Sequence, residues 1–188
     1  MEEFTFKWPG KGFVIGDLQV PVPIVQGGMG IGVSGRRLAT AVANQGGVGV
    51  LSAVGLGYLG LPCEIESQEG DSHNITILRQ EVRKARQQTN GVLGVNIMVA
   101  IREFTETARA AIEEGVDVIF AGAGLPLNLP ACLTEQAKTK LVPIVSSAKA
   151  ARLIAKRWMS RYHYAPDAFV LEGPKAGGHL GFSPEHIV

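Results

Sequence analysis

A glycine-rich stretch with a single histidine holds the side chains best suited to chemistry. Residues 172–181, EGPKAGGHLG, directly follow the apolar run 168–171, so a buried strand is predicted to end where they begin. Glycine lets a backbone approach a flat ligand without a Cβ in the way. Histidine ordinarily titrates near neutrality, so His179 can take or give a proton. The stretch is therefore either a glycine turn with an exposed histidine or a site at a strand end, where loops often carry chemistry.

Composition and charge predict one globular domain over residues 1–188. Hydrophobic residues make up 46% and charged residues 19%, and the net charge of +1 argues against a nucleic-acid partner. Cys63 and Cys132 show no metal-type spacing, so we expect ordinary thiols and no metal site. The sequence has neither a signal-peptide pattern nor an apolar stretch of the ~18 residues that a membrane span needs. We therefore expect a cytoplasmic protein without a membrane partner.

Apolar runs alternate with helical patterns along the chain. A hairpin is predicted for residues 13–15 and 18–20, with its turn at 16–17. Ser34 and Ser147 are expected to be N-caps of two helices, and Leu38, Ala41 and Val42 recur at helical spacing in the first. Strands are predicted at 23–26, 47–52, 92–98, 116–120, 141–146 and 168–171, and helices at 34–46, 77–88, 103–114, 133–138 and from 147 onward.

This alternation predicts a parallel sheet covered by helices, either a doubly wound open sheet or a TIM (β/α)8 barrel. An open sheet concentrates its ligand contacts at one switch point, whereas a barrel gathers every strand end around one mouth. Glycine, small or polar residues follow most of the predicted strands, namely Gln26 to Gly28, Ser52, Asn96, Gly122, Ser146, Ser147, Glu172 and Gly173. Six strand ends of this kind favour the barrel.

The predicted barrel is incomplete at its C-terminal side. Eight strands and about 250 residues are typical of the fold, whereas only the first six β/α units are found here. Residues 183–188 have the pattern expected at the beginning of another helix. The phosphate site of such barrels often follows strands seven and eight. The irregular, glycine- and acid-rich segment 55–74 is predicted to be a lid-like insertion.

Three segments of the chain resemble the nitronate monooxygenase family, formerly called 2-nitropropane dioxygenases, which includes the flavin-dependent enoyl-acyl-carrier-protein reductases. They are residues 23–29 (PIVQGGM), 94–98 (GVNIM) and 172–181, and the AGGH of the last is the most specific. The resemblance runs from about Phe13 to His186. It implies an FMN-binding TIM barrel with the flavin across its mouth.

The resemblance also implies roles for individual residues. Gly27, Gly28 and Met29 would run along the isoalloxazine ring, and Asn96 would hydrogen-bond its pyrimidine side. The other cofactor-binding positions would be Glu172, where many relatives carry glutamine, together with Gly177 and Gly178. His179 matches the catalytic histidine. It would act as a base toward a nitroalkane or as a hydrogen-bond donor to a nitronate.

Three hypotheses about function follow. The first is an FMN-dependent monooxygenase that oxidises small alkyl nitronates or nitroalkanes with O2. The second is a flavin-dependent enoyl-acyl-carrier-protein reductase that uses NAD(P)H. The third is a non-catalytic, incomplete barrel without bound flavin, whose exposed strand edges would favour a homodimer.

Overall fold

The computed structural model describes residues 8–59 and 62–177. A short hairpin precedes a regular alternation of strands and helices. The strands are β1 (Phe13–Ile15), β2 (Leu18–Val20), β3 (Gly49–Ser52), β4 (Leu93–Met98), β5 (Val118–Gly122), β6 (Lys140–Val145) and β7 (Val170–Leu171). The α-helices are α1 (Arg36–Asn44), α2 (His73–Arg86), α3 (Phe104–Glu113) and α4 (Ala148–Tyr162), with single 3-10 turns at Leu56–Leu59 and Leu129–Cys132.

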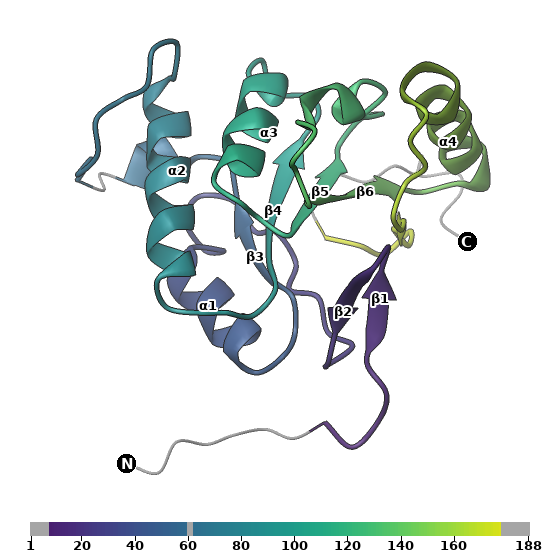
Figure 1. The fold of residues 1–188 in the computed structure, drawn as a ribbon, viewed down its shortest axis with the longest axis horizontal. Coiled ribbons are helices and arrows are strands. Elements are labelled where there is room, and N and C mark those ends of the chain that lie inside the picture. Colours follow the sequence, from purple (N-terminus) through teal and green to yellow (C-terminus); the bar gives the residue numbers. More distant parts are fainter. Residues whose placement is uncertain (1–7, 60–61, 178–188) are drawn as a thin grey trace.

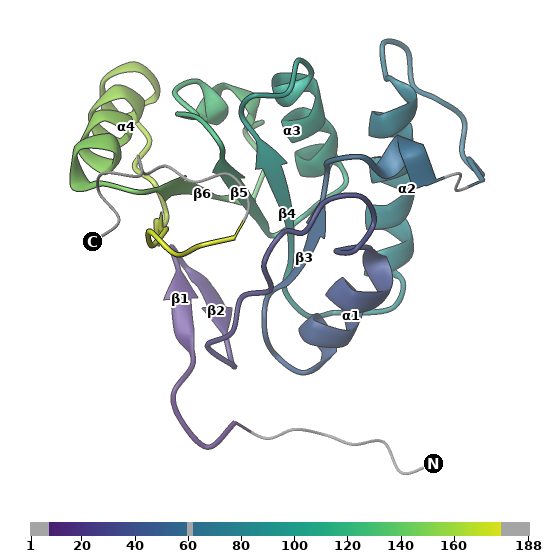
Figure 2. The ribbon, with the colours of Figure 1, turned by 180° about the vertical axis from the view of Figure 1, so that it is seen from behind.

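Strands β3 to β7 form one curled parallel sheet in which neighbours in sequence are neighbours in space. Helices α2, α3 and α4 spread along the outer side of this sheet, and the hairpin lies apart from them (Figures 1 and 2). A doubly wound sheet would reverse its strand order at a switch point. The continuous order β3-β4-β5-β6-β7 instead belongs to a barrel wall, which confirms the predicted TIM-barrel class in the form of a half-barrel.

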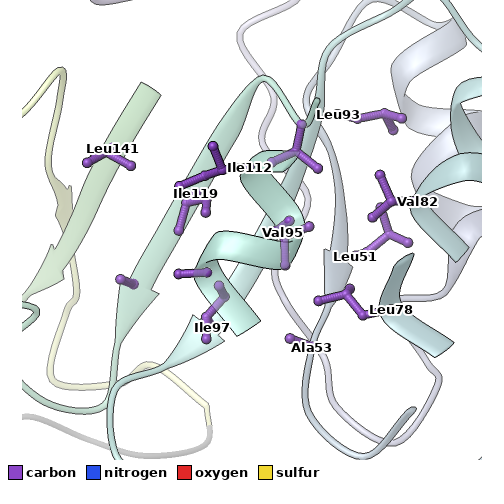
Figure 3. Close-up of a cluster of buried hydrophobic side chains, with 14 of the residues drawn as sticks. Leu51, Ala53, Leu78, Val82, Leu93, Val95, Ile97, Ile112, Ile119 and Leu141 are labelled. Carbon is purple, nitrogen blue, oxygen red and sulfur yellow. The ribbon is translucent and has the colours of Figure 1, made fainter. Parts of the chain in front are cut away.

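Alternate residues along each strand separate two hydrophobic cores. One set, including Leu51, Val95 and Ile119, points outward and packs against Val82 of α2 and Ile112 of α3 (Figure 3). Because side chains alternate across a strand, the intervening residues point to the inner face of the wall.

The inner core joins the hairpin to the wall. Val50, Phe120 and Val142 lie on the inner face and pack with Ile15 and Val20 of the hairpin. The predicted hairpin is thus confirmed, and it covers part of the inner face of the wall.

Two aspartates hold successive strands in register at their N-terminal ends. The Asp117 carboxylate, just before β5, accepts from the Leu93 N–H at 2.8 Å, and the Asp117 N–H donates back to the Leu93 carbonyl at 2.8 Å. Asp167 makes the same pair of bonds to Leu141, at 2.8 and 3.2 Å. The hairpin joins this end through an N–H of Gly16 that donates to the Asp167 carbonyl. At the opposite end of the wall the strands end and the loops begin.

The predicted strand at 23–26 is wrong in extent. Only Val25 pairs with the sheet, through one parallel bridge to Val48, and Ile24 and Val25 are 51% and 41% exposed. Pro21 and Pro23 lack an N–H and cannot extend a ladder on this side. The first unit of the barrel is thus a short bridged segment rather than a buried strand.

Three helix predictions also need correction. Helix α1 buries Ala39, Thr40 and Ala43, while Leu38 and Ala41 of the predicted apolar face are exposed. The predicted helix at 133–138 is a single turn, preceded by the 3-10 turn, because only two of its six residues are apolar. Helix α2 begins at His73 rather than at 77, since the Ser72 hydroxyl accepts from the Ile75 N–H as its N-cap. Ser147 is confirmed as the N-cap of α4.

Two further findings concern the cysteines and the apolar length of the helices. Cys63 is exposed and Cys132 buried, and both are free thiols. Of the helices that the structure describes, none is both long and apolar enough to cross a membrane.

Candidate functional site

The C-terminal ends of the parallel strands form one rim of the half-barrel. The register places Ser52 of β3 beside Asn96 of β4, and Asn96 beside Phe120 of β5. Residues aligned across neighbouring strands point to the same face, and Phe120 belongs to the inner core. Asn96 therefore faces the inside of the barrel close to its rim.

Gly28 and Asn96 are in direct contact, although 68 positions separate them. A Cβ added at Gly28 would lie 2.4 Å from the Asn96 Cβ and 2.6 Å from its amide nitrogen, so only glycine fits. Among residues 8–59 and 62–177, a Cβ added at Gly27 would meet nothing within 4 Å. Met29, next along the loop, is 44% exposed. Four of the predicted cofactor residues thus meet at one place, with open space beside Gly27.

The side chains of Gln26 and Ser34, for which the sequence predicted no role in the cofactor site, hold this loop. The Gln26 amide nitrogen donates to the Val50 carbonyl at 2.8 Å and to the Ser34 hydroxyl at 3.0 Å. The Ser34 hydroxyl donates to the Gly27 carbonyl at 2.9 Å and accepts from the Met29 N–H at 2.9 Å.

Ser34 is therefore not the predicted N-cap of α1. Gly35 occupies that position without a side-chain bond. A serine at this position in the sequence could cap the helix or hold the preceding loop. The only sequence feature that pointed to the loop was Gln26, a glutamine at the end of an apolar run.

Glu172 lies at the other end of the rim, and the predicted cofactor residue Gly177 is exposed five positions farther along the chain. The Glu172 N–H donates to the Val145 carbonyl at 2.8 Å, which places Glu172 directly after β7 and beside the end of β6. In the order of the sheet, β7 is three strands away from the strand that carries Asn96. Gly178 and His179 lie outside the described residues, so the catalytic role of His179 stays a prediction.

The segment 55–74 is tied both to the rim and to helix α2. The Asn74 amide donates to the Ala53 carbonyl at 3.1 Å and accepts from the Gly57 N–H at 3.1 Å. Farther along, the Glu64 N–H donates to the Gln80 side chain at 2.6 Å, and Lys84 pairs with the Glu64 carboxylate at 2.6 Å. The segment starts next to the end of β3, and its role as a lid remains a prediction.

Metal-binding side chains do not gather in the part of the chain that the structure describes. Within residues 8–59 and 62–177, no three His, Cys, Asp or Glu side chains are placed to hold an ion. Apart from the Glu172 carboxylate, the polar groups described at the rim are amides, hydroxyls and backbone groups. This set is better suited to hydrogen-bonding an organic ligand than to coordinating a metal.

The half-barrel with a glycine and asparagine rim defines an α/β protein of the TIM-barrel class. The sequence model of the nitronate monooxygenase family matches residues 12–187. The chain belongs to that family.

Two similar proteins are named as dehydrogenases, and both are longer than this chain. A (3aS,4S,5R,7aS)-5-hydroxy-7a-methyl-1-oxo-octahydro-1H-indene-4-carboxyl-CoA dehydrogenase of Mycobacterium tuberculosis is 30% identical over 85% of this chain and 38% of its own length. Its namesake in Rhodococcus jostii is 28% identical over the same shares.

The solved structures that resemble this chain also belong to longer proteins. FabK from Thermotoga maritima is 30% identical with a TM-score of 0.65, over 85% of this chain and 43% of its own. A nitroalkane oxidase from Streptomyces ansochromogenes is 25% identical with a TM-score of 0.62, over 88% of this chain and 51% of its own. The chain thus spans about half or less of the length of these relatives.

Proposed function

We propose that this chain carries part of an FMN-dependent oxidoreductase of the nitronate monooxygenase type, acting on small nitronates or nitroalkanes with O2. The contact between Gly28 and Asn96, with open space beside Gly27, is the observation that carries this proposal. A flat ring system can lie close only to bare backbone or small side chains, and Gly27 and Gly28 present such a backbone.

The rim residues fit a flavin in their chemistry as well as in their shape. The Asn96 amide has both donors and an acceptor, which suits the pyrimidine edge of an isoalloxazine. FMN, when bound, would supply the electron-accepting chemistry of the reaction. Glu172, Gly177 and Gly178 would complete the contacts, and His179 would hold or remove the substrate proton, as the family resemblance implies.

A reductase that acts on thioesters is the second candidate. Two observations favour it: the identity to FabK reaches 31%, and the CoA-ester dehydrogenase of Mycobacterium tuberculosis is 30% identical, against 25% for the nitroalkane oxidase. Both candidates use the same rim and the same cofactor. They differ in whether a nitronate or NAD(P)H delivers electrons.

Titration of the purified 188-residue chain with FMN tests the shared part of both candidates. We expect the flavin fluorescence to be quenched and the visible absorption band to shift at micromolar protein. A chain that leaves both signals unchanged at 100 μM protein, on the order of the weakest useful cofactor affinity, would refute the proposal. That result would favour the hypothesis of a non-catalytic barrel without flavin.

Anaerobic mixing of the loaded chain with electron donors separates the candidates. Bleaching of the flavin band by propyl-2-nitronate, but not by NADH or NADPH, is expected for the nitronate enzyme. The reverse result would support the thioester reductase. Removal of the side chain in His179→Ala should leave FMN binding within about twofold and slow reduction by neutral 2-nitropropane about 10²–10⁴-fold.

A further inference from the structure

The side chain of Gln26 takes the place of a peptide group in the sheet. The backbone of the 24–26 segment pairs with Val48, the residue before β3, through two bonds, from the Gln26 N–H to the Val48 carbonyl at 3.0 Å and from the Val48 N–H to the Ile24 carbonyl at 2.9 Å. The next pair is made by the side-chain amide, which donates to the Val50 carbonyl at 2.8 Å and accepts from the Val50 N–H at 3.3 Å. The ladder is thus continued by the side chain, and the main chain is free to leave the sheet at Gly27.

Ser34 closes the loop that begins there. It is fully buried and makes five hydrogen bonds. Its backbone N–H donates to the Met29 carbonyl at 3.0 Å, and its carbonyl accepts from the Ser52 N–H at the end of β3 at 2.9 Å. Its hydroxyl donates once, to Gly27, and accepts twice, from Met29 and Gln26, which is the full capacity of a hydroxyl.

This bonding decides which backbone groups of the loop remain available. The carbonyl of Gly27 and both polar groups of Met29 are used by Ser34. The N–H groups of Gly27 and Gly28, by contrast, donate to no other residue in the part of the chain that the structure describes. Two neighbouring donors are therefore held at the rim, beside the open space at Gly27 and the Asn96 amide.

We propose that Gln26 and Ser34 are positioning residues, which fix the Gly27–Met29 loop so that its free N–H groups meet the polar edge of the cofactor. This inference rests on the proposed function. It predicts that the loop is already in its binding shape in the chain without cofactor. A preformed site avoids the cost of ordering a glycine-rich loop when the ligand binds.

The substitution Ser34→Ala tests the inference, with Thr139→Val as the matched control. Each removes a buried hydroxyl that donates to a backbone carbonyl, since Thr139 donates to the Val116 carbonyl at 2.7 Å. Thr139 directly precedes β6, at the N-terminal end of the wall, away from the rim. Hydrogen exchange of the Met29 amide is measured in the cofactor-free chain, and FMN affinity and the visible circular dichroism of bound flavin are measured in the loaded chain.

We expect Ser34→Ala to speed exchange of the Met29 amide at least tenfold and to weaken FMN binding at least tenfold, with a changed visible dichroism. Thr139→Val should leave all three readouts within about twofold of the wild type. Should Ser34→Ala fail to fold, Gln26→Met takes its place, because methionine keeps the length of the side chain and removes its polar end.

The outcomes separate the two claims. Faster exchange at Met29 with unchanged FMN affinity would overturn the positioning role and leave the proposed function intact. Equal losses of affinity in Ser34→Ala and Thr139→Val would also overturn it, because a general loss of stability would then explain both. A wild-type chain that binds no FMN would refute the proposed function itself, and the positioning role with it.

Discussion

Adding one methyl group at Gly28 should damage the rim, whereas the same change at Gly27 should not. In Gly28→Ala the new Cβ would lie 2.4 Å from the Cβ and 2.5 Å from the Cγ of Asn96. Carbon atoms in good contact are about 3.5–4.0 Å apart, so one of the two groups must move by more than about 1 Å. The Asn96 Cβ belongs to strand β4 and cannot swing away as the end of a long side chain could.

The size of the effect follows from overpacking. Forcing an extra methyl group into a filled site costs about 1–3 kcal/mol in the free energy of unfolding. For a chain of this length each kcal/mol lowers the melting temperature by about 2–4 °C. Gly27→Ala places its Cβ in open space, and Gly27 is not among the glycines with positive φ, so we expect a change within about 0.5 kcal/mol.

Urea unfolding and FMN titration of the two variants together give the assay. Gly28→Ala should lose stability in the cofactor-free chain. Gly27→Ala should keep its stability and still bind FMN at least tenfold more weakly, because its methyl group would occupy the space intended for the ring. Wild-type stability in Gly28→Ala would refute the close contact with Asn96. Wild-type FMN affinity in Gly27→Ala would refute the assignment of this loop to the cofactor.

Two predictions concern groups away from the rim. Burial, and then the neighbouring Asp167 carboxylate, raise the pKa of Tyr164 above its ordinary value. The tyrosine of the unfolded chain ionises at lower pH, so this contribution to the free energy of unfolding is complete below about pH 10 and is lost above it. Tyr164→Phe should therefore flatten the fall in the free energy of urea unfolding between pH 9 and 11. Parallel pH curves for the wild type and the variant would contradict this. Arg79→Met should cost roughly 3 kcal/mol, because it removes the ion-pair partner of the largely buried Asp71 carboxylate and one of the two arginine partners of Glu114. The same substitution at the exposed neighbouring arginine, Arg83→Met, should cost about 0–1 kcal/mol. Equal losses of stability in the two variants on thermal unfolding would contradict the greater weight given to the Arg79 ion pairs.

Local patterns were sufficient for most elements of the fold. Strands β3 to β6 are apolar runs, and burial on both faces gives such runs in any parallel sheet. The bridged segment at Val25 was predicted as a full strand because its apolar residues look the same in sequence whether or not a neighbour covers them. Likewise Leu38 and Ala41 are apolar but face away from the sheet, since the smaller Ala39 and Ala43 allow α1 to approach β3 closely.

The sequence by itself determined the class of the fold and the kinds of residue at its rim, because hydrophobic period and strand-end glycines are local properties. Only the tertiary structure decided that Gly28 lies against Asn96, since that contact depends on the register of β3 with β4 and on the path of a loop 68 residues away. It also decided the role of Ser34. A serine hydroxyl can cap a helix or close a loop, and the positions of Gln26, Gly27 and Met29 around it select the second. The glycine and histidine stretch at 172–181 remains the catalytic prediction.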